Sequence, residues 1–323
     1  MEVLMSESIS QLFLNLENWK FQQFNPQVGI SNPENHAYAI QIQPENRSKN
    51  INLESFYNLL EDPQSSKIQA LICQIEYENY WNNNNICFGI VLEALCDAYE
   101  KLPNLQALFI GDAEQHEYRK SKLAIFDIRP ILEAFPNLQL LKVRGQFYEY
   151  LLECETLIHK NLKTLIIETA DIDDRNFSQI CALELPNLEC LELWLGRQLR
   201  NETFIIDNLI PIFFGESFPN LAYLGLRSSE FSDLLAENIV RSPMIERLLV
   251  LDLSMGNLSD YGANALLNCP AINQLHTLNI SNNCVSEGMV QRLLQLNCQV
   301  IADEQQDEIE GGCSVSRYCA LYE

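Results

Sequence analysis

The sequence predicts an α/β solenoid, in which short parallel strands and return helices alternate along the chain. Three observations predict it: a recurring spacing of apolar residues, apolar segments of helical period between the copies, and prolines where those helices should stop. The clearest copy is PNLECLELWLG at residues 186–196, whose leucines follow the spacing LxxLxL. A period of two within a copy is typical of a strand, and recurrence along the chain is typical of a stacked array.

Each copy is placed by its anchor, the fourth residue of LxxLxL. The residues three before, at and two after each anchor make 24 positions, and all of them are apolar. At a background of 47% hydrophobic residues, the chance of this is on the order of one in 10⁸ before the free choice of register is discounted, and that discount is too small to make chance the explanation. The anchors are Leu71, Leu108, Leu141, Leu165, Leu191, Leu224, Leu251 and Leu278. We expect a leucine-rich-repeat solenoid, with a curved parallel β-sheet on the concave face and helices on the convex face.

The segments between the strands are expected to return the chain as helices. Apolar residues recur at helical spacing in 86–99, 131–135, 234–240 and 288–296. Ser232, Ser259 and Ser286 stand where helix N-caps belong, each followed by an acidic residue. Two long intervals between successive anchors indicate insertions at 112–123 and 195–205, and we expect these insertions to protrude as loops.

The two ends of the array need caps, since a terminal repeat would expose its apolar side to water. Residues 1–65 lack the repeat and are expected to form an N-terminal cap, with a strand at 37–42 and a short helix at 53–60. Residues 66–301 hold the repeats, with a further strand expected within 297–302. Residues 302–323 are an acidic loop and a segment, SVSRYCALYE, that is apolar enough to dock as a C-terminal cap. A loose tail that binds a partner is the alternative.

The charge of the chain narrows the classes of partner. Of the 323 residues, 44 are acidic and 21 basic, which gives a formal net charge of −23. This charge would repel nucleic-acid phosphates and anionic lipids, so neither nucleic acid nor a membrane is an expected partner. The acidity either keeps the protein soluble or favours a basic partner.

The beginning of the chain and its cysteines indicate a compartment. The first 20 residues have no basic leader or small-residue cleavage site, and no apolar run is long enough for a membrane span. The 11 cysteines include no CxxC pair, and several stand where apolar residues are expected, which is typical of reduced core thiols. We therefore expect a cytoplasmic protein.

Particular segments add a resemblance to known proteins. VLDLSMGNLSDYGANALLNCP at 250–270 resembles the ribonuclease-inhibitor-like class of leucine-rich repeats, whose units carry LxxLxLxxNxL before a helix. Asn283 keeps the turn asparagine of that pattern, whereas the preceding repeat has Gly256 there. The segments LPNLQALFIGD, FPNLQLLKVRG, LPNLECLELWLG and FPNLAYLGLR, with RYCALYE at the end, are similar to a family of bacterial cytosolic leucine-rich-repeat proteins. The resemblance implies the fold and implies no particular activity.

The side chains of the concave face can be read from the register. In each strand the anchor and the residue two after it should point into the core, while the residues one before, one after, three after and four after the anchor face the concave side. We expect Arg144 to lie beside Glu168, and Trp194 beside Arg227. Exposed Trp, Tyr and Arg side chains dominate binding hot spots. The candidate site for a protein or peptide partner is Lys142, Arg144, Glu168, Glu192, Trp194, Tyr223, Arg227 and Asp252. The alternative is that these charges only pair across strands.

Catalytic and metal chemistry has little support in the sequence. Lys120 replaces the second histidine of an HExxH motif at His116, and GxSxG, GxxxxGK[ST] and GxGxxG are absent, so no metal, cofactor or catalytic residue is expected. Two groups of acidic residues are expected to be solvated loop residues or helix caps. They are Asp112, Glu114 and Glu117, and Asp171, Asp173 and Asp174. We predict a non-catalytic binding scaffold. The alternatives are a substrate-recognition subunit for a separate modifying enzyme and an enzyme that uses Glu168, Glu192 and Asp252.

Overall fold

The computed structural model describes residues 12–44, 51–75, 86–87, 89–113, 123–125, 127–147, 156–169, 172, 174–196, 209–214 and 217–306. The described residues form two compact units. Unit 1 contains those up to 147 and residues 157–166, and unit 2 contains residue 156 and those from 167 to 306. Strand β11 (Thr164–Glu168) has residues in both units.

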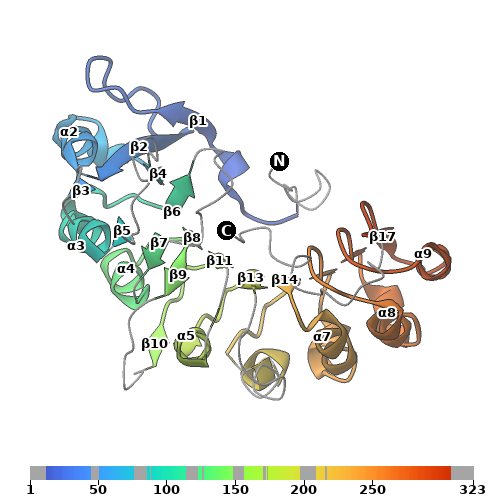
Figure 1. Ribbon diagram of the computed structural model, residues 1–323. Helices are drawn as coiled ribbons and strands as arrows, with labels where there is room; N and C mark the ends of the chain where they lie inside the picture. Colours follow the sequence, from blue (N-terminus) through green and yellow to red (C-terminus); the bar gives the residue numbers. More distant parts are fainter. Residues whose placement is uncertain are drawn as a thin grey trace. The chain divides into compact units, whose positions relative to one another are not determined.

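Unit 1 is built on parallel strands, drawn in blue to green in Figure 1. Leu71 pairs with Leu108 and Leu108 with Leu141, so these anchors lie in register as predicted. A short antiparallel strand, β3 (Ile51–Asn52), pairs with the end of β2. In hydrogen-bonded order the parallel strands are β1 (Lys20–Gln23), β2 (His36–Pro44), β4 (Ala70–Ile75), β6 (Ala107–Ala113) and β8 (Leu140–Arg144).

The array of strands begins earlier than the leucine pattern indicates. Strand β2 pairs in parallel with β4, and Tyr38 lies beside Leu71, so a buried tyrosine occupies the anchor position. The strand expected at 37–42 and the helix expected at 53–60 are confirmed as β2 and α2 (Glu54–Glu61). The division into cap, repeats and C-terminal cap at residues 65 and 301 stays a prediction.

The return segments of unit 1 contain helices and a second, smaller sheet. The helices after α2 are α3 (Gly89–Asp97) and α4 (Arg129–Ala134), and the 3-10 turns are η1 (Leu16–Asn18), η2 (Ser65–Lys67) and η3 (Tyr99–Lys101). The helix expected at 86–99 starts only at Gly89, because the residues before it pair with other return segments. The paired segments are β5 (Ile86–Cys87), β7 (Leu123–Ile125) and β9 (Gln146–Phe147). The insertion at 112–123 thus ends in a strand, and its residues 114–122 lie outside the described part.

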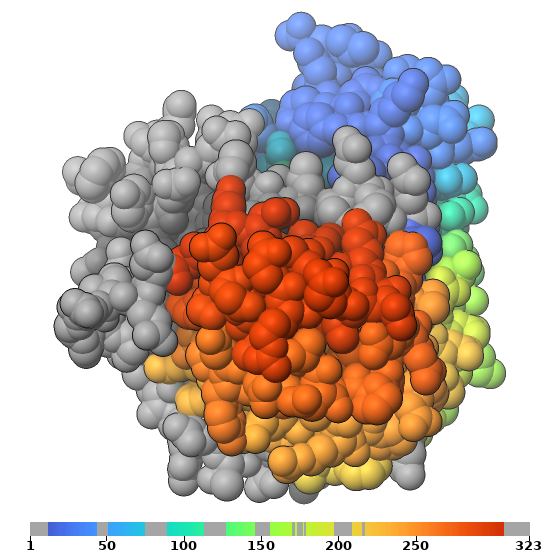
Figure 2. Space-filling view, turned by 90° about the vertical axis from the view of Figure 1, so that its right-hand side faces the viewer, coloured from blue at the N-terminus to red at the C-terminus, as the bar shows by residue number. Residues whose placement is uncertain are grey.

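Unit 2 continues the same plan towards the C-terminus. Leu191, Leu224, Leu251 and Leu278 are paired in register, and Val300 takes the next anchor position, which confirms the further strand predicted within 297–302. Figure 2 shows the surface made by the last of these repeats, in orange and red. The strands are β13 (Cys190–Gly196), β14 (Tyr223–Ser229), β15 (Val250–Asp252), β16 (Thr277–Asn279) and β17 (Gln299–Ile301). Two short strands lie outside the large sheet: β10 (Leu157–Ile158), whose residues belong to unit 1, and β12 (Leu183–Glu184) of unit 2.

The helices of unit 2 lie on one side of its strands (Figure 1). We call the other side of each sheet the helix-distal face. The helices are α5 (Asp174–Cys181), α7 (Ser232–Ile239), α8 (Asp260–Leu267) and α9 (Glu287–Leu293), with 3-10 turns η5 (Pro243–Glu246) and η6 (Pro270–Gln274). In the described part of the chain, no helix combines the length and apolar character that crossing a membrane requires.

Two of the three predicted serine N-caps are confirmed. Ser259 and Ser286 accept hydrogen bonds from backbone N–H groups in the first turns of α8 and α9. The third prediction was wrong, because α7 starts at Ser232 itself, whose hydroxyl donates to the backbone oxygen of Ser229 at 2.9 Å. Asp233 and Asp260 connect successive helices: Asp233 accepts from the backbone and hydroxyl of Ser259, at 2.8 and 2.6 Å, and Asp260 accepts from those of Ser286, at 2.8 and 2.7 Å.

Asn283, the turn asparagine predicted from the repeat pattern, forms hydrogen bonds through both the nitrogen and the oxygen of its side-chain amide. Asn283 donates to the backbone oxygens of Leu253 and Ile280, at 2.9 and 3.0 Å, and accepts from Leu258 N at 2.9 Å. In the preceding repeat a side chain at Gly256 would place its Cβ only 2.1 Å from Ser232 Oγ. The hydroxyl of Ser232 thus occupies the space that an asparagine side chain would need at position 256.

In unit 1 the helix-distal face is apolar, and the chain itself covers it. Alanines occupy the position before the anchor in β2, β4 and β6, and two residues later stand Ala39 in β2, Ile72 in β4 and Phe109 in β6. Trp19 packs against this surface, with Leu14 and Leu16 alongside it. The surface consists of Ala37, Ala39, Ala70, Ile72, Ala107, Phe109 and Leu140.

Candidate functional site

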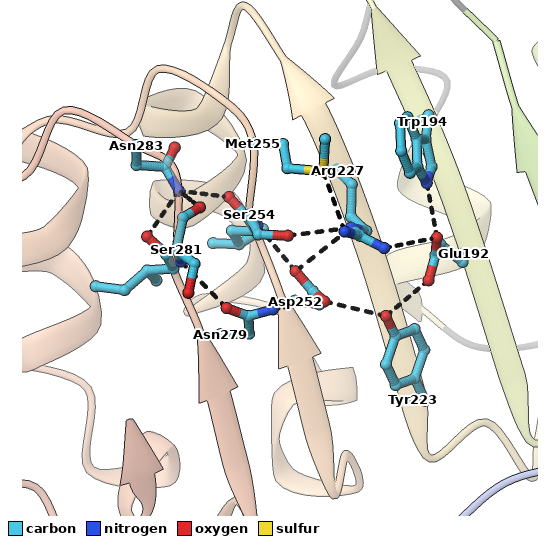
Figure 3. Close-up of polar contacts among 12 residues, drawn as sticks. Glu192, Trp194, Tyr223, Arg227, Asp252, Ser254, Met255, Asn279, Ser281 and Asn283 are labelled. Atoms are coloured by element: carbon cyan, nitrogen blue, oxygen red, sulfur yellow. Dashed lines mark hydrogen bonds and ion pairs between the residues drawn. The ribbon is translucent and has the colours of Figure 1, made fainter. Parts of the chain in front are cut away.

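Strands β13, β14 and β15 bring five predicted site residues together on the helix-distal face of unit 2. Glu192 and Trp194 come from β13, Tyr223 and Arg227 from β14, and Asp252 from β15 (Figure 3). We call these five residues the charge cluster. Trp194 pairs in register with Arg227, and the guanidinium carbon lies 4.9 Å from the centre of the tryptophan ring. The predicted contact between these two residues is therefore confirmed.

Tyr223 connects the two carboxylates of the cluster. Glu192 and Asp252 pair with the same residue, Gly225, from opposite sides, so one strand separates them. The tyrosine hydroxyl lies 2.9 Å from Glu192 Oε2 and 3.2 Å from Asp252 Oδ2. A Cβ at Gly225 would lie 3.0 Å from the Tyr223 ring and 3.1 Å from Glu192 Cγ. Glycine at this position leaves the space in which the bridge forms.

Arg227 spans the same gap with its guanidinium. Its Nη1 donates to Glu192 Oε1 at 2.9 Å, and its Nε donates to Ser254 Oγ at 3.0 Å and lies 3.8 Å from Asp252 Oδ1. Its Nη2 lies 3.1 Å from the sulfur of Met255. Glu192 Oε1 also accepts from Trp194 Nε1 at 2.6 Å. One cation and one indole N–H thus converge on a single carboxylate oxygen.

The polar contacts continue beyond the predicted residues into β16. Asn279 Nδ2 donates to Asp252 Oδ2 at 2.9 Å, and the backbone of Ser254 donates to Asp252 Oδ1 at 2.9 Å. Asn279 and Ser254 stand at positions predicted to face the concave side, but the candidate set was limited to charged residues, Trp194 and Tyr223. Met255 stands four after its anchor, also a position predicted to face this side, and nothing in the leucine pattern singles it out.

The structure corrects the expectation that these side chains are exposed. Relative exposure is 0% for Tyr223, 3% for Arg227 and 7% for Trp194, and both cluster carboxylates are buried. Alternation in a strand predicts which face a side chain occupies, but it contains no information about whether water reaches that face. The cluster is therefore a buried network rather than an open row of hot spots.

Burial and charge set the protonation of the donors. Burial, together with the charges of Asp252 and Glu192, raises the pKa of Tyr223 well above its ordinary value, so the hydroxyl keeps its proton. Burial lowers the pKa of Arg227, but the carboxylates of Glu192 and Asp252 raise it by more, and the guanidinium stays charged. Two carboxylates then face one guanidinium.

Cys190 lies next to the cluster, at the position before the anchor of β13. It is fully buried, and burial followed by the charges of Glu192 and Asp252 raises the pKa of its thiol well above the ordinary value. The thiolate is the nucleophilic form of cysteine. Cys190 is therefore in the unreactive form at neutral pH.

The remaining predicted site residues occupy other surroundings. Lys142 Nζ and Arg144 Cζ lie 4.6 and 5.5 Å from the ring centre of Phe109, and Arg144 Nη1 is 4.0 Å from Asp112 Oδ1. Glu168 is buried in unit 2, where its charge contributes to the raised pKa of Arg227. Arg144 belongs to unit 1, so the expected pair of Arg144 and Glu168 stays a prediction.

Asp112 was predicted to lie in a protruding loop, and this was wrong. A bulge at Gly111, where φ is +95°, shifts the register so that Asp112 pairs with Gln74 inside the sheet. Gln74 Nε2 donates to Asp112 Oδ2 at 2.8 Å. Of the other acidic residues considered for metal binding, Asp174 begins α5, and Glu114, Glu117, Asp171 and Asp173 lie outside the described residues. The described side chains form no group of three or more His, Cys, Asp or Glu residues suited to a metal ion.

Comparison with known proteins addresses the fold. No model of a known protein family matches the chain, and a search of curated proteins gives no match. The crystal structure of a protein from Bacteroides fragilis is similar over 81% of this chain and 71% of its own, with 24% sequence identity and a TM-score of 0.69. An internalin (inlF) from Listeria monocytogenes aligns over 80% of this chain and 71% of its own, but its 14% identity and TM-score of 0.34 are too low to support an inference. The likeness to the Bacteroides fragilis protein is one of fold, and the in-register leucine anchors make that fold an α/β leucine-rich-repeat solenoid.

Proposed function

We propose that this protein is a non-catalytic, cytoplasmic scaffold that binds a protein or peptide on the helix-distal face of unit 2, at the charge cluster. The observation that carries the proposal is the presence of buried charges where the fold does not need them. The positions before and after the anchor in β4 and β6 of unit 1, which correspond to Tyr223, Glu192 and Asp252, hold alanine, isoleucine and phenylalanine, all buried. The same architecture thus accepts apolar residues at the positions of the two carboxylates, whereas three residues after the anchor β4 holds the polar Gln74.

The energetics of burial support a functional role for the cluster. Removing ions from water costs several kcal/mol each, and replacement of buried ion pairs by apolar residues of similar volume is often neutral or stabilising by about 1–4 kcal/mol. Glu192, Arg227 and Asp252 are all buried. Because stability alone favours apolar side chains there, recognition of a partner is the better explanation for the charged ones.

The charge balance of the cluster favours a basic partner. Among the described residues, the carboxylates of Glu192 and Asp252 share one guanidinium, and this excess of negative charge beneath the face favours a partner surface that carries arginine or lysine. The formal net charge of −23 on the whole chain would attract such a partner from a distance.

The contacts also support a binding role over a catalytic one. Both carboxylates lie within hydrogen-bond distance of the single hydroxyl of Tyr223, and Arg227 and Asn279 add further donors. A general base must instead have a lone pair aimed at substrate. The neighbouring thiol of Cys190 is held in its protonated form.

The proposal is tested by affinity capture from the native cell with two conservative variants, Trp194→Phe and Arg227→Met. Each keeps most of the side-chain volume and removes the donor that reaches Glu192. Arg241→Met is the control, because Arg241 is exposed. We expect a partner that is retained by the wild type and by the control, and lost by both cluster variants. Equal recovery of the same partner with all four proteins would refute the site.

A further inference from the structure

The N-terminal segment 12–19 lies on the helix-distal face of unit 1, and we propose that it is a built-in competitor for an apolar peptide ligand of that face. The inference is independent of the charge cluster, because it concerns different residues in the other unit. It assigns a second interaction surface and gives the chemistry of the segment that fits it. That chemistry is a leucine pair followed by a tryptophan, as in LFLNLENW.

The surface under the segment has the composition of a binding site for large apolar side chains. Ala37, Ala70 and Ala107 are paired with one another across β2, β4 and β6, and all three are buried. Neighbouring strands lie about 4.8 Å apart, so these alanines form a continuous row of small side chains. Ile72 and Phe109 flank the row, and the ring of Trp19 packs against this surface. Without the segment, this surface would be a contiguous apolar patch of the kind that marks interaction sites.

A local turn satisfies several polar groups of the segment. The side chain of Asn15 accepts from Glu17 N at 2.8 Å, and the side chain of Asn18 accepts from Asn15 N at 2.9 Å. The backbone N–H of Trp19 donates to Leu16 O at 3.1 Å and completes the turn η1. Leu14, Leu16 and Trp19 then point to the sheet as one apolar side. Because these hydrogen bonds lie within the segment, the segment can separate from the sheet without breaking hydrogen bonds between strands.

The first strand of the sheet begins directly after the segment. Lys20 begins β1, and its backbone donates to Asn35 O at 2.9 Å. The sheet also holds the segment through Thr164 Oγ1, which donates to Leu14 O at 2.7 Å. The structural boundary between covering segment and sheet therefore lies between Trp19 and Lys20, and opening of the segment leaves β1 in place.

The first test measures local opening in the wild-type protein by hydrogen exchange and mass spectrometry. We expect the amides of 16–19 to exchange at least about a hundredfold faster than those of β4 and β6, because the segment opens without global unfolding. Equal protection of the segment and these core strands would overturn the proposal, since the segment would then open only when the protein unfolds.

The second test measures competition in the full-length chain. A fluorescently labelled peptide of residues 12–20 is titrated with the wild type and with the variant Leu14→Ser/Leu16→Ser, and binding is followed by anisotropy. We expect the variant to bind the peptide at least about tenfold more tightly than the wild type, because loss of two leucine contacts frees the surface. A control peptide with serine in place of the tryptophan should bind neither protein.

Two outcomes of the second test would overturn the proposal. The first is a folded variant that binds the peptide no better than the wild type. The second is a variant that fails to fold, because residues 12–19 would then be part of the core rather than a removable occupant. Thr164→Val is a milder probe of the same contact, since it removes the hydrogen bond to Leu14 and leaves the leucines in place. We expect it to increase binding of the peptide by a smaller factor than the double variant.

Discussion

Replacement of Tyr223 by phenylalanine tests whether the charge cluster is a connected network. The change removes one hydroxyl and keeps the ring, so packing is preserved. The hydroxyl is fully buried and lies between two carboxylates, at 2.9 Å from Glu192 and 3.2 Å from Asp252. A buried hydrogen bond to a charged group contributes about 1.5–3 kcal/mol, and its loss leaves two carboxylates with one donor fewer. We expect Tyr223→Phe to lower the free energy of unfolding by about 2–3 kcal/mol.

The protein contains a matched control for this substitution in the same unit. Tyr261 also donates to a carboxylate at 2.9 Å, that of Glu237, but its side chain is 66% exposed. Water replaces the lost partner at such a site, so Tyr261→Phe should change the free energy of unfolding by less than about 0.5 kcal/mol. Urea unfolding followed by circular dichroism gives both values, with the slope m expected to be unchanged. The reasoning is refuted if the two substitutions have equal effects.

Two other predictions concern substitutions at single positions. Gly225→Ala should destabilise the protein by about 1–3 kcal/mol, because its Cβ would press on Tyr223 and Glu192, which are both held by hydrogen bonds. Gly288→Ala in α9, where an added Cβ has nothing within 4 Å, should instead stabilise the protein by about 0.4–1 kcal/mol. The urea midpoint should therefore fall below that of the wild type in Gly225→Ala and rise above it in Gly288→Ala, and any other order would contradict the geometry. Burial raises the pKa of Cys73 from 9.0 to about 12. The unfolded state therefore loses this proton first as pH rises, and stability should fall from pH 9 upward, by about 3 kcal/mol at pH 11. The fall should be smaller by that amount in Cys73→Ala, and identical alkaline profiles for the two proteins would show that this thiol is not the cause.

The leucine spacing was sufficient to predict the repeat and its register. An anchor such as Leu191 must be buried, and a slip of one residue would turn every side chain of its strand to the other face. The pairing of Leu191 with Leu224 therefore followed from the pattern. Asparagines in the PNL segments add inter-repeat contacts that the leucine rows do not show: Asn220 Nδ2 donates to Pro186 O at 2.7 Å.

Features that depend on local departures from the pattern could not be predicted in this way. Tyr38 occupies an anchor position without being leucine, so β2 was assigned to a cap. The bulge at Gly111 moves Asp112 into the sheet, and a count of residues cannot detect an inserted position. One signal was present and unused: Ile72 and Phe109 are apolar at positions expected to face a partner or water. Their apolar character indicates a cover, which the structure identifies as residues 13–19.

The candidate site was predicted in its position but not in its environment. Register placed Glu192, Trp194 and Arg227 on one face, and their contacts confirm this. Their burial depends on what lies over the strands, which is a property of the tertiary structure. A buried cluster with more negative than positive charge changes the expected partner from one that meets an open aromatic row to one that supplies a cation.

The central claim is that the cluster serves recognition rather than stability, and one neutral variant tests it most directly. Glu192→Gln/Arg227→Met/Asp252→Asn removes all three charges and keeps the side-chain volumes close to those present. Replacement of a whole buried ion pair by apolar residues of similar volume is often neutral or stabilising by about 1–4 kcal/mol, and the two amides retain an oxygen that can accept the hydrogen bonds of Trp194 and Tyr223. We predict an unfolding free energy equal to or above that of the wild type, together with loss of the captured partner. Unchanged capture, or a loss of stability of several kcal/mol, would contradict the claim.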